Sequence, residues 1–212
     1  PSDWDGQRRL RVGFLSRHFK NHSIGKTSLG LIRETDPARF ERVALSILPN
    51  DDETSRAIEA AADRFVRLPY NLLDARRLIA EQRLDVLFYQ DLGMETLSWL
   101  LAFARLAPVQ CVSFGHPDTT GIPNVDWWVS SDLFEPEGAQ AHYSERLHLL
   151  KDAGTLAYYY PPRDPGPVTR ADLGLPEEGR LYVCPQTLFK FHPEFDPVLE
   201  GILRGDSGGR LV

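Results

Sequence analysis

The sequence predicts an α/β protein whose core is a Rossmann-like, doubly wound parallel sheet. Three observations support this prediction. Strand-like and helix-like segments alternate from residue 10 to residue 131. The run LDVLFYQ (84–90) is almost continuously apolar, as expected for a parallel strand that is covered on both faces. Apolar residues then recur with the period of a helix that faces a core, at Leu97, Leu100, Leu101 and Ala104.

Each element has its own local signal. Short apolar runs predict strands at 10–16, 40–48, 64–69, 84–90, 109–114 and 125–131. Helices are predicted between them, at 23–34, 51–63, 71–83 and 97–104. Pro37 ends the first helix, Asn71 caps the start of the third, and Pro108 ends the fourth. The run HYSERLHLL (142–150) predicts a short helix that enters a strand, and we expect no catalytic role for it. Residues 1–150 are therefore predicted to form one domain.

The character of the chain changes after residue 150. Residues 151–178 hold five of the sixteen prolines, which predicts a linker with one short helical turn. Residues 179–212 then offer a strand (180–184), a helix (192–205) and a second short strand (209–212). This last segment is either the incomplete start of a second domain or an accessory element that packs on the first.

Composition excludes several classes of protein. The formal net charge is −6, from 24 basic and 30 acidic residues, which argues against a dedicated nucleic-acid surface. No apolar stretch is long enough to span a bilayer, and the first ten residues contain no signal-peptide core. The two cysteines, Cys111 and Cys184, form no cluster with metal-ligand spacing. We expect a cytoplasmic protein with no metal ion and no membrane or nucleic-acid partner.

Ligands of a doubly wound sheet bind beyond the carboxyl ends of its strands, so the loops found there are the candidate site. These loops cover residues 16–22, 90–93, 115–121 and 185–193. The first of them carries His18 and His22 where a nucleotide-binding domain often has a glycine-rich turn. Imidazole titrates near neutrality, so both are candidates for acid–base work. The alternative is that both histidines are structural.

The other loops offer different chemistry. GHPDTTG (115–121) provides glycines for close backbone approach, an imidazole and two hydroxyls. The alternative is a structural turn in which Thr119 and Thr120 bond their own backbone. In PQTLFKFHP (185–193), Pro193 suits the first position of a helix, whose free N–H groups attract anions. Lys190 adds a positive charge there, so this loop suits a diphosphate, unless Lys190 is simply solvated.

Four segments together resemble one known family. LRVGFLSRHFKNHSIG, APVQCVSFGHPDTTGIPNVDWWVSSD, HYSERL and PQTLFKFHPEF resemble the catalytic region of the protein O-GlcNAc transferases and their bacterial SPINDLY-like relatives, in the same order from about residue 9 onward. The resemblance implies a GT-B arrangement, in which two Rossmann-like lobes enclose the active site. It also implies an inverting, metal-independent transfer of a sugar from a UDP donor to a protein, with no cofactor. Residues 1–150 would be the acceptor-side lobe and residues 179–212 a truncated start of the UDP-sugar-binding lobe.

The resemblance also assigns roles to individual residues. Asn21-His22 matches the family's Asn-His pair, which makes His22 a catalytic residue and a candidate base. Lys190 matches the lysine that contacts the UDP diphosphate, so it is the second catalytic residue. The expected substrate-binding residues are Asn21, His116, Pro117, Thr119, Thr120, Gly121 and Gln186.

Three positions depart from the family pattern. His18 stands where many relatives have Asp, Met94 where many have His or Tyr, and His116 where the eukaryotic enzymes have Tyr. We therefore expect transfer of GlcNAc to Ser or Thr, with two alternatives. One is transfer of glucose from UDP-glucose to Asn, as in bacterial relatives with a Gly-His-Pro loop. The other is a non-catalytic binding or scaffold module.

The partners implied are a UDP-sugar and a protein acceptor. Many family members carry helical repeats before the catalytic region, and these are absent from this sequence. Because a GT-B site needs both lobes, we expect the 212 residues alone to be inactive. An unrelated Rossmann-like nucleotide-binding domain is a third interpretation, but no GxGxxG motif follows the first strand and no acidic residue is placed for a ribose.

Overall fold

The computed structural model describes residues 4, 6–152, 154–156, 158–161, 164 and 166–212. The chain divides into two compact units, Pro1–Pro161 and Pro162–Val212. The division falls within the segment 151–178, of which residues 153, 157, 162–163 and 165 lie outside the described residues. Each unit is described by itself below.

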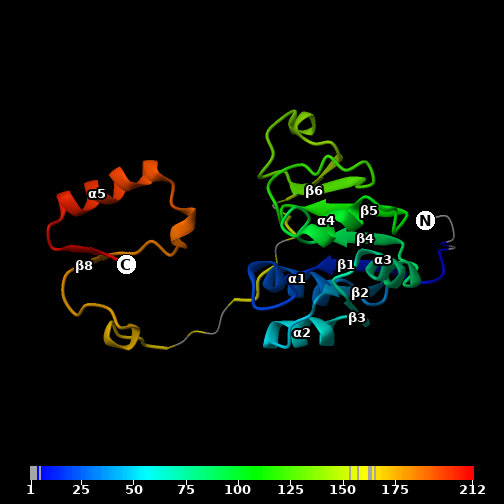
Figure 1. The fold of residues 1–212 in the computed structure, drawn as a ribbon, viewed down its shortest axis with the longest axis horizontal. Helices are drawn as coiled ribbons and strands as arrows, with labels where there is room; N and C mark the ends of the chain where they lie inside the picture. The colour runs from blue at the N-terminus through cyan, green and yellow to red at the C-terminus, as the bar shows by residue number, and fades with distance from the viewer. Residues whose placement is uncertain (1–3, 5, 153, 157, 162–163, 165) are drawn as a thin grey trace. The chain divides into compact units, whose positions relative to one another are not determined.

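One parallel sheet forms the centre of the first unit (Figure 1). Its strand order is β3-β2-β1-β4-β5-β6-β7, and every neighbouring pair is parallel. The strands are β1 (Leu10–Ser16), β2 (Phe40–Ile47), β3 (Arg64–Leu68), β4 (Val86–Tyr89), β5 (Val109–Ser113), β6 (Trp127–Ser131) and β7 (Arg146–Leu150). The chain first adds β2 and β3 on one side of β1. It then crosses to the other side of β1 and adds β4, β5, β6 and β7 in turn. The predicted doubly wound, Rossmann-like sheet is therefore confirmed, with its topological switch point between β1 and β4.

Four α-helices connect the strands, and a side chain caps the start of each one. The helices are α1 (Ser23–Glu34), α2 (Glu53–Ala61), α3 (Leu72–Glu81) and α4 (Thr96–Ala102). The caps are His22, Asp52, Asn71 and Glu95, in that order. The predicted cap at Asn71 is confirmed, because its Oδ1 accepts the N–H groups of Leu73 and Asp74 at 3.0 and 3.1 Å. These contacts satisfy donors that a helix start leaves free.

Alternate residues of the central strands face two separate apolar cores. On one face, Phe14 and Phe88 share a core with Ile32 of α1 and Ile58 of α2. The other face carries the larger core, whose members include Leu15, Leu45, Leu87, Tyr89, Ile79 of α3 and Leu101 of α4. A sheet covered on both faces needs such strands, which explains the nearly continuous apolar run at 84–90.

Helix α4 differs from its prediction. Leu97 and Leu101 are buried as expected, but Leu100 is 39% exposed, and the helix already ends at Ala102. In this short helix the buried stripe runs through Leu97, Ser98, Leu101 and Ala102. Leu100 therefore shares the solvent-facing side with Trp99 and Phe103.

The run 142–150 also differs in detail. The strand is present as β7, but the helical turn before it is a 3-10 turn at Ala139–His142, which ends where the predicted helix was to begin. Residues 143–145 therefore form a connection rather than a helix, and this places the carboxylate of Glu145 near another loop, as described below.

The second unit contains a pair of short parallel strands, β8 (Arg180–Tyr182) and β9 (Gly209–Leu211). The chain between them forms helix α5 (Asp196–Gly205). One 3-10 turn, Ala171–Leu173, precedes the strands. None of the helices in the described ranges of either unit is long and apolar enough to cross a membrane.

Candidate functional site

Three loops meet at the carboxyl ends of β1, β4 and β5, beside the switch point. Glycines allow this close packing. Gly93 has φ +97°, and a Cβ at this position would lie 2.9 Å from the ring of His116. A Cβ on Gly115 would lie 2.0 Å from the backbone oxygen of Gln90. Since no other residue fits either place without movement, these glycines join the loop after β4 to the loop after β5.

His22 lies in the loop after β1 and caps α1. Its Nδ1 accepts the N–H of Ile24 at 3.2 Å, and its ring stacks on His18 with the centroids 4.3 Å apart. Burial and the nearby charge of Lys20 lower the pKa of His22, so the ring is neutral at pH 7. A neutral imidazole whose Nδ1 accepts a hydrogen bond carries its proton on Nε2. His22 can therefore donate a hydrogen bond from Nε2, but it cannot accept a proton there.

Asp91 connects the loop after β4 to the loop after β1. Its side chain is fully buried, and Oδ2 accepts the Ser16 hydroxyl at 2.9 Å and the Arg17 N–H at 2.8 Å. Oδ1 has no hydrogen-bond partner among the described residues. Burial raises the pKa of Asp91 to about 6, against the lowering effect of the two hydrogen bonds. This carboxyl therefore titrates close to neutrality.

His18 lies against the same carboxylate, with Nε2 4.0 Å from Oδ2 of Asp91. Burial is the main reason that the pKa of His18 falls to about 4, and the charges of His22 and Lys20 add to the effect. At pH 7 the stacked pair of His18 and His22 is thus neutral. His18 supports the ring of His22 from one side, which gives this departure from the family pattern a structural role.

Asn21 is held by the loop after β2. Its backbone N–H donates to Oδ2 of Asp52 at 2.8 Å, while Oδ1 of Asp52 accepts the N–H of Ser55 at the start of α2. One carboxylate therefore fixes both a helix start and the backbone of the Asn21-His22 pair. The side chain of Asn21 is exposed and is free to meet a ligand.

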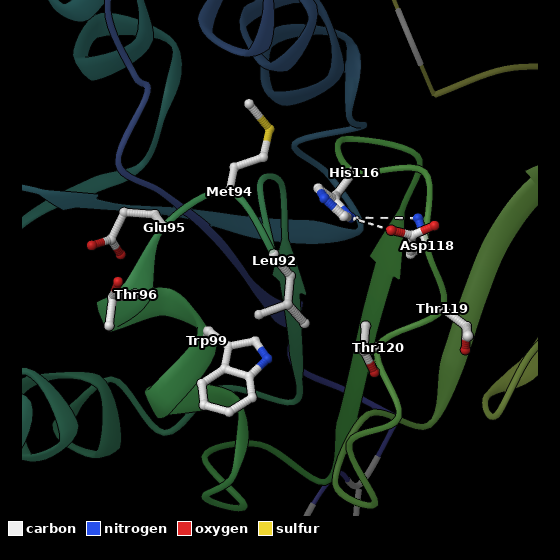
Figure 2. A pocket seen from close by; sticks show the side chains of 10 residues that line it. Leu92, Met94, Glu95, Thr96, Trp99, His116, Asp118, Thr119 and Thr120 are labelled. Carbon is white, nitrogen blue, oxygen red and sulfur yellow. Dashed lines mark hydrogen bonds and ion pairs between the residues drawn. The ribbon is translucent and has the colours of Figure 1, made fainter.

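A cavity of about 420 Å³ lies between the loop after β4 and the loop after β5 (Figure 2). Figure 2 shows Leu92 and Trp99 on one side of it, and His116 and Thr120 on the other. The complete lining consists of Leu92, Gly93, Met94, Glu95, Thr96, Trp99, His116, Asp118, Thr119 and Thr120. Of the predicted substrate-binding residues of this loop, the cavity thus brings together His116, Thr119 and Thr120, whereas Pro117 and Gly121 lie outside its lining.

Glu145 fixes the wall that carries the two threonines. It is 2% exposed, and it accepts the Thr119 hydroxyl at 2.7 Å, the Thr120 N–H at 2.9 Å and the Thr120 hydroxyl. Burial pushes the pKa of Glu145 upward, but the hydrogen bonds from Thr120 and Thr119 outweigh it and lower the pKa. Both hydroxyl protons are therefore directed at Glu145. The Thr119 oxygen also accepts the N–H and the hydroxyl of Ser144, both at 2.9 Å, so only the Thr120 oxygen keeps a lone pair for a ligand.

Sequence reasoning missed Glu145, although this residue lies in the family-like segment HYSERL. It considered only bonds from the threonines to their own backbone, and one such bond exists, from the N–H of Ile122 to the Thr120 hydroxyl at 3.1 Å. The available signal was that Glu145, an acidic residue, comes directly before a strand, while the loop after β5 has the adjacent hydroxyls of Thr119 and Thr120. Trp99 was also missed, because the helical pattern drew attention to Leu100 instead.

Gln186 and Lys190 lie in the second unit, and both are exposed. Oε1 of Gln186 accepts the N–H of Thr187 at 3.0 Å. Lys190 ends a 3-10 turn, Leu188–Lys190. Its ammonium group takes part in none of the ion pairs found among the described residues, so it is available to an anion.

The helix start predicted at Pro193 needs a correction. Pro193–Phe195 is a 3-10 turn, and α5 begins at Asp196. A second proline, Pro197, occupies the first turn of α5, where its fixed φ favours helix initiation. In the 3-10 turn, the ring of His192 already accepts the N–H of Glu194 at 3.3 Å. The anion site predicted here thus rests more on the charge of Lys190 than on free helical N–H groups.

Within the part of the chain that the structure describes, no three His, Cys, Asp or Glu side chains are grouped to hold a metal ion. The loops after β1, β4 and β5 offer a hydrogen-bond donor in the imidazole of His22, the buried carboxyl of Asp91, and a cavity whose wall is fixed by the buried carboxylate of Glu145.

Comparison with known proteins connects these loops to one family. The sequence model described as glycosyl transferase family 41 matches residues 2–157. A probable UDP-N-acetylglucosamine–peptide N-acetylglucosaminyltransferase, SEC of Arabidopsis thaliana, is 26% identical over 196 residues, which cover 89% of this chain and 20% of that protein. The corresponding SPINDLY protein of Eustoma exaltatum subsp. russellianum is 30% identical over 217 residues, covering 98% of this chain and 22% of that protein.

A solved structure agrees with these matches. A mutant O-GlcNAc transferase of Thermobaculum terrenum superposes with a TM-score of 0.76 at 28% identity, over 98% of this chain and 39% of that one. The chain spans about a fifth of the length of the curated relatives it matches.

Proposed function

Because this chain belongs to glycosyl transferase family 41, we propose that it forms the acceptor-side lobe, with the start of the donor lobe, of a protein glycosyltransferase. The names of the SEC and SPINDLY relatives support UDP-GlcNAc as the donor and a peptide as the acceptor, and we propose that the acceptor hydroxyl belongs to Ser or Thr. One structural observation supports this most. The loop after β5, which carries one of the family-like motifs, meets the loop after β4 beside the switch point, and these two loops line a cavity of about 420 Å³.

The proposed reaction is a direct displacement that inverts the sugar. The acceptor oxygen forms a bond to the anomeric carbon, the bond from that carbon to the UDP oxygen breaks with its electron pair remaining on UDP, and the acceptor proton passes to water. Lys190 stabilises the negative charge that grows on the departing diphosphate. No metal ion or cofactor is part of this proposal, so EDTA should leave the rate of transfer unchanged.

His22 has a defined part in this reaction. The sequence made it a candidate base, but its Nδ1 is occupied by the N–H of Ile24, so its free nitrogen bears a proton. We therefore propose that Nε2–H of His22 orients an oxygen of the acceptor or of the donor phosphate. His22→Ala should lower the rate at every pH and leave the shape of the pH–rate profile unchanged. Loss of a titration step near neutrality in this variant would instead identify His22 as the base.

The test of the function is transfer by the complete protein that contains this chain. Mass spectrometry of acceptor proteins after incubation with UDP-GlcNAc should detect the added sugar, and Lys190→Ala should abolish it while the fold is retained. Lys151→Ala is the matched control, since Lys151 is also an exposed lysine but lies outside the proposed site. Near wild-type turnover by the Lys190 variant would reject the assignment.

Two further candidates rest on single residues. His116 in the Gly-His-Pro sequence favours transfer of glucose to Asn, which the same assay detects when UDP-glucose replaces UDP-GlcNAc. Met94 lines the cavity where many relatives have a titratable or hydroxyl side chain, and this favours a non-catalytic binding module. UDP binding without transfer of either sugar would support the module.

The remaining parts of the proposal concern the complete protein. We propose that a helical-repeat region precedes this chain, as in many family members. We also propose a cytoplasmic location, because Cys111 and Cys184 are free thiols. The 212 residues alone are expected to be inactive, because the reaction needs the donor lobe as well.

A further inference from the structure

The cavity between the loops after β4 and β5 has one aromatic wall. The indole of Trp99 is 41% exposed, and Phe103 holds it in an edge-to-face contact with the ring centroids 4.7 Å apart and the planes at 74°. Figure 2 shows the indole on the cavity side of α4, facing the loop after β5 that carries Thr120. A large ring that is fixed in place and open to solvent is a platform for a flat or cationic group.

The opposite wall carries a carboxylate without a Lys or Arg partner. The side chain of Asp118 is 81% exposed, and among the described residues only Nδ1 of His116 lies within ion-pair distance of it, at 3.9 Å. Glu95 adds a second carboxylate at the cavity edge, although it also accepts the N–H of Ser98 at 2.7 Å as the cap of α4. The lining contains these two acids and no Lys or Arg.

This charge pattern selects between the two substrates of the proposed reaction. Two carboxylates in a lining that holds no Lys or Arg repel a diphosphate, so the cavity is unsuited to the donor. They attract a cation, and the indole of Trp99 binds a cation on its face. Arginine satisfies both walls better than lysine does, because its planar guanidinium stacks on an aromatic ring and still presents N–H groups to a carboxylate.

We propose that this cavity binds an arginine side chain of the acceptor polypeptide, close in sequence to the residue that is modified. The guanidinium stacks on Trp99 and pairs with Asp118. The inference rests on the proposed function for the identity of the polypeptide, and it adds a selection rule. Acceptor segments with a nearby arginine are preferred over segments with an apolar or acidic residue at the same position.

The test measures peptide binding without any donor. Three capped hexapeptides of the form Gly-Ala-X-Ser-Ala-Gly carry arginine, norleucine or glutamate at X. NMR spectra of the ¹⁵N-labelled chain at millimolar peptide follow the indole N–H signal of Trp99, which Trp99→Phe identifies. The arginine peptide should shift this signal and bind roughly five- to tenfold more tightly than the norleucine peptide, as an exposed cation–π contact and a surface ion pair together allow.

Two variants and two matched controls complete the design. Trp99→Ala and Asp118→Asn should each reduce the preference for arginine by at least about half. Trp4→Phe is the aromatic control, since Trp4 is 40% exposed, and Asp51→Asn is the acidic control, since Asp51 is exposed on another loop. Both controls should keep the full preference.

Several results would overturn the proposal. These are the absence of a shift at the Trp99 signal, equal affinity for the three peptides, or an arginine preference that survives both substitutions. Because no sugar donor is used, failure here leaves the proposed transfer reaction untouched. Conversely, if a complete protein binds the arginine peptide but transfers no sugar, the proposed transfer reaction is rejected and the proposed arginine-binding cavity is retained.

Discussion

Two buried carboxylates hold the two sides of the candidate site, and they differ in their hydrogen-bond partners. Glu145 receives donors on both oxygens, from the hydroxyls of Thr119 and Thr120 and from the N–H of Thr120. Asp91 receives donors on Oδ2 only, from Ser16 and Arg17. Both are almost fully inaccessible to solvent, at 2% and 0% exposure. Yet the pKa of Glu145 is lowered, while the pKa of Asp91 is raised to about 6.

The difference shows that burial alone does not set the charge of these groups. Burial penalises the ionised form of each, and donors directed at the oxygens offset that penalty. At Glu145 the donors outweigh burial, so a fixed negative charge organises the cavity wall. At Asp91 one oxygen lacks a partner among the described residues, so the charge is easily lost. The charge of Glu145 is therefore insensitive to pH near neutrality, whereas the charge of Asp91 is sensitive to it.

The largest expected effect is on stability at pH 7. Glu145→Gln replaces one accepting oxygen with an NH₂ group that faces the threonine donors, so the free energy of unfolding should fall by about 2–4 kcal/mol. Asp91→Asn keeps one oxygen for its two donors and removes a charge whose burial costs up to about 3 kcal/mol, so the free energy of unfolding should stay the same or rise by up to about 3 kcal/mol. Urea unfolding of the chain measures both. Equal losses in the two variants would remove the basis of the comparison.

A second prediction separates the two groups by pH. The folded pKa of Asp91 exceeds its ordinary value of 3.8, so its contribution to stability is complete below pH 3.8 and is lost as pH rises through 6. This loss is about 3 kcal/mol at most. The pKa of Glu145 is lowered, so its contribution is present above its ordinary value of 4.5 and is lost as pH falls further.

The measurement is urea unfolding between pH 3.5 and about 7. Asp91→Asn should remove a decline in stability between about pH 4 and 6, whereas Glu145→Gln should change only the acid side. His18 acts in the same range with the opposite sign, since its folded pKa of about 4 lies below 6.5, and its contribution is lost as pH falls. Each variant is therefore compared with the wild type at the same pH. A flatter profile for Glu145→Gln above pH 5 would contradict the account.

The smallest predicted effect tests the threonines. Thr120→Val removes a hydroxyl that donates to Glu145 and accepts from Ile122, so we expect a loss of about 1–2 kcal/mol. Thr119→Val removes a hydroxyl that donates to Glu145 and accepts from Ser144, but Thr119 is exposed and water can replace these contacts, so we expect a loss of about 0.5–1 kcal/mol. Thermal or urea unfolding distinguishes them. A larger loss of unfolding free energy in the Thr119 variant would show that the Thr120 hydroxyl is not the main support of the cavity wall.

The sequence was sufficient for most of the fold, because alternation and caps are local signals. The strands of the main sheet follow apolar runs, and Asn71 identified a helix start within one residue. The same strand-end reasoning indicated the correct loops. The helical periodicity was misleading for α4. This helix has only seven residues, and apolar side chains lie on two neighbouring faces of it, so the face through Leu100 was predicted to be buried although it is exposed.

The organisation of the site was less predictable, because it depends on contacts between distant segments. Glu145 meets Thr119 and Thr120 across about 25 residues of chain, and Asp91 meets Ser16 across 75. In a single sequence the first pairing leaves only a weak signal, an acidic residue directly before a strand, and the second leaves none. The capping role of His22 was also missed, because a histidine at that place is more readily considered as a catalyst than as a helix cap.

Steady-state kinetics of the complete protein test the central claim, that this unit is the acceptor side of a glycosyltransferase. Thr120→Val disturbs the cavity wall and lies in the first unit, whereas the proposed diphosphate contact, Lys190, lies in the second. With UDP-GlcNAc and a protein acceptor varied in turn, we predict that Thr120→Val raises KM for the acceptor several-fold and leaves KM for UDP-GlcNAc within about twofold. An unchanged acceptor KM with a raised donor KM would contradict the assignment of this lobe.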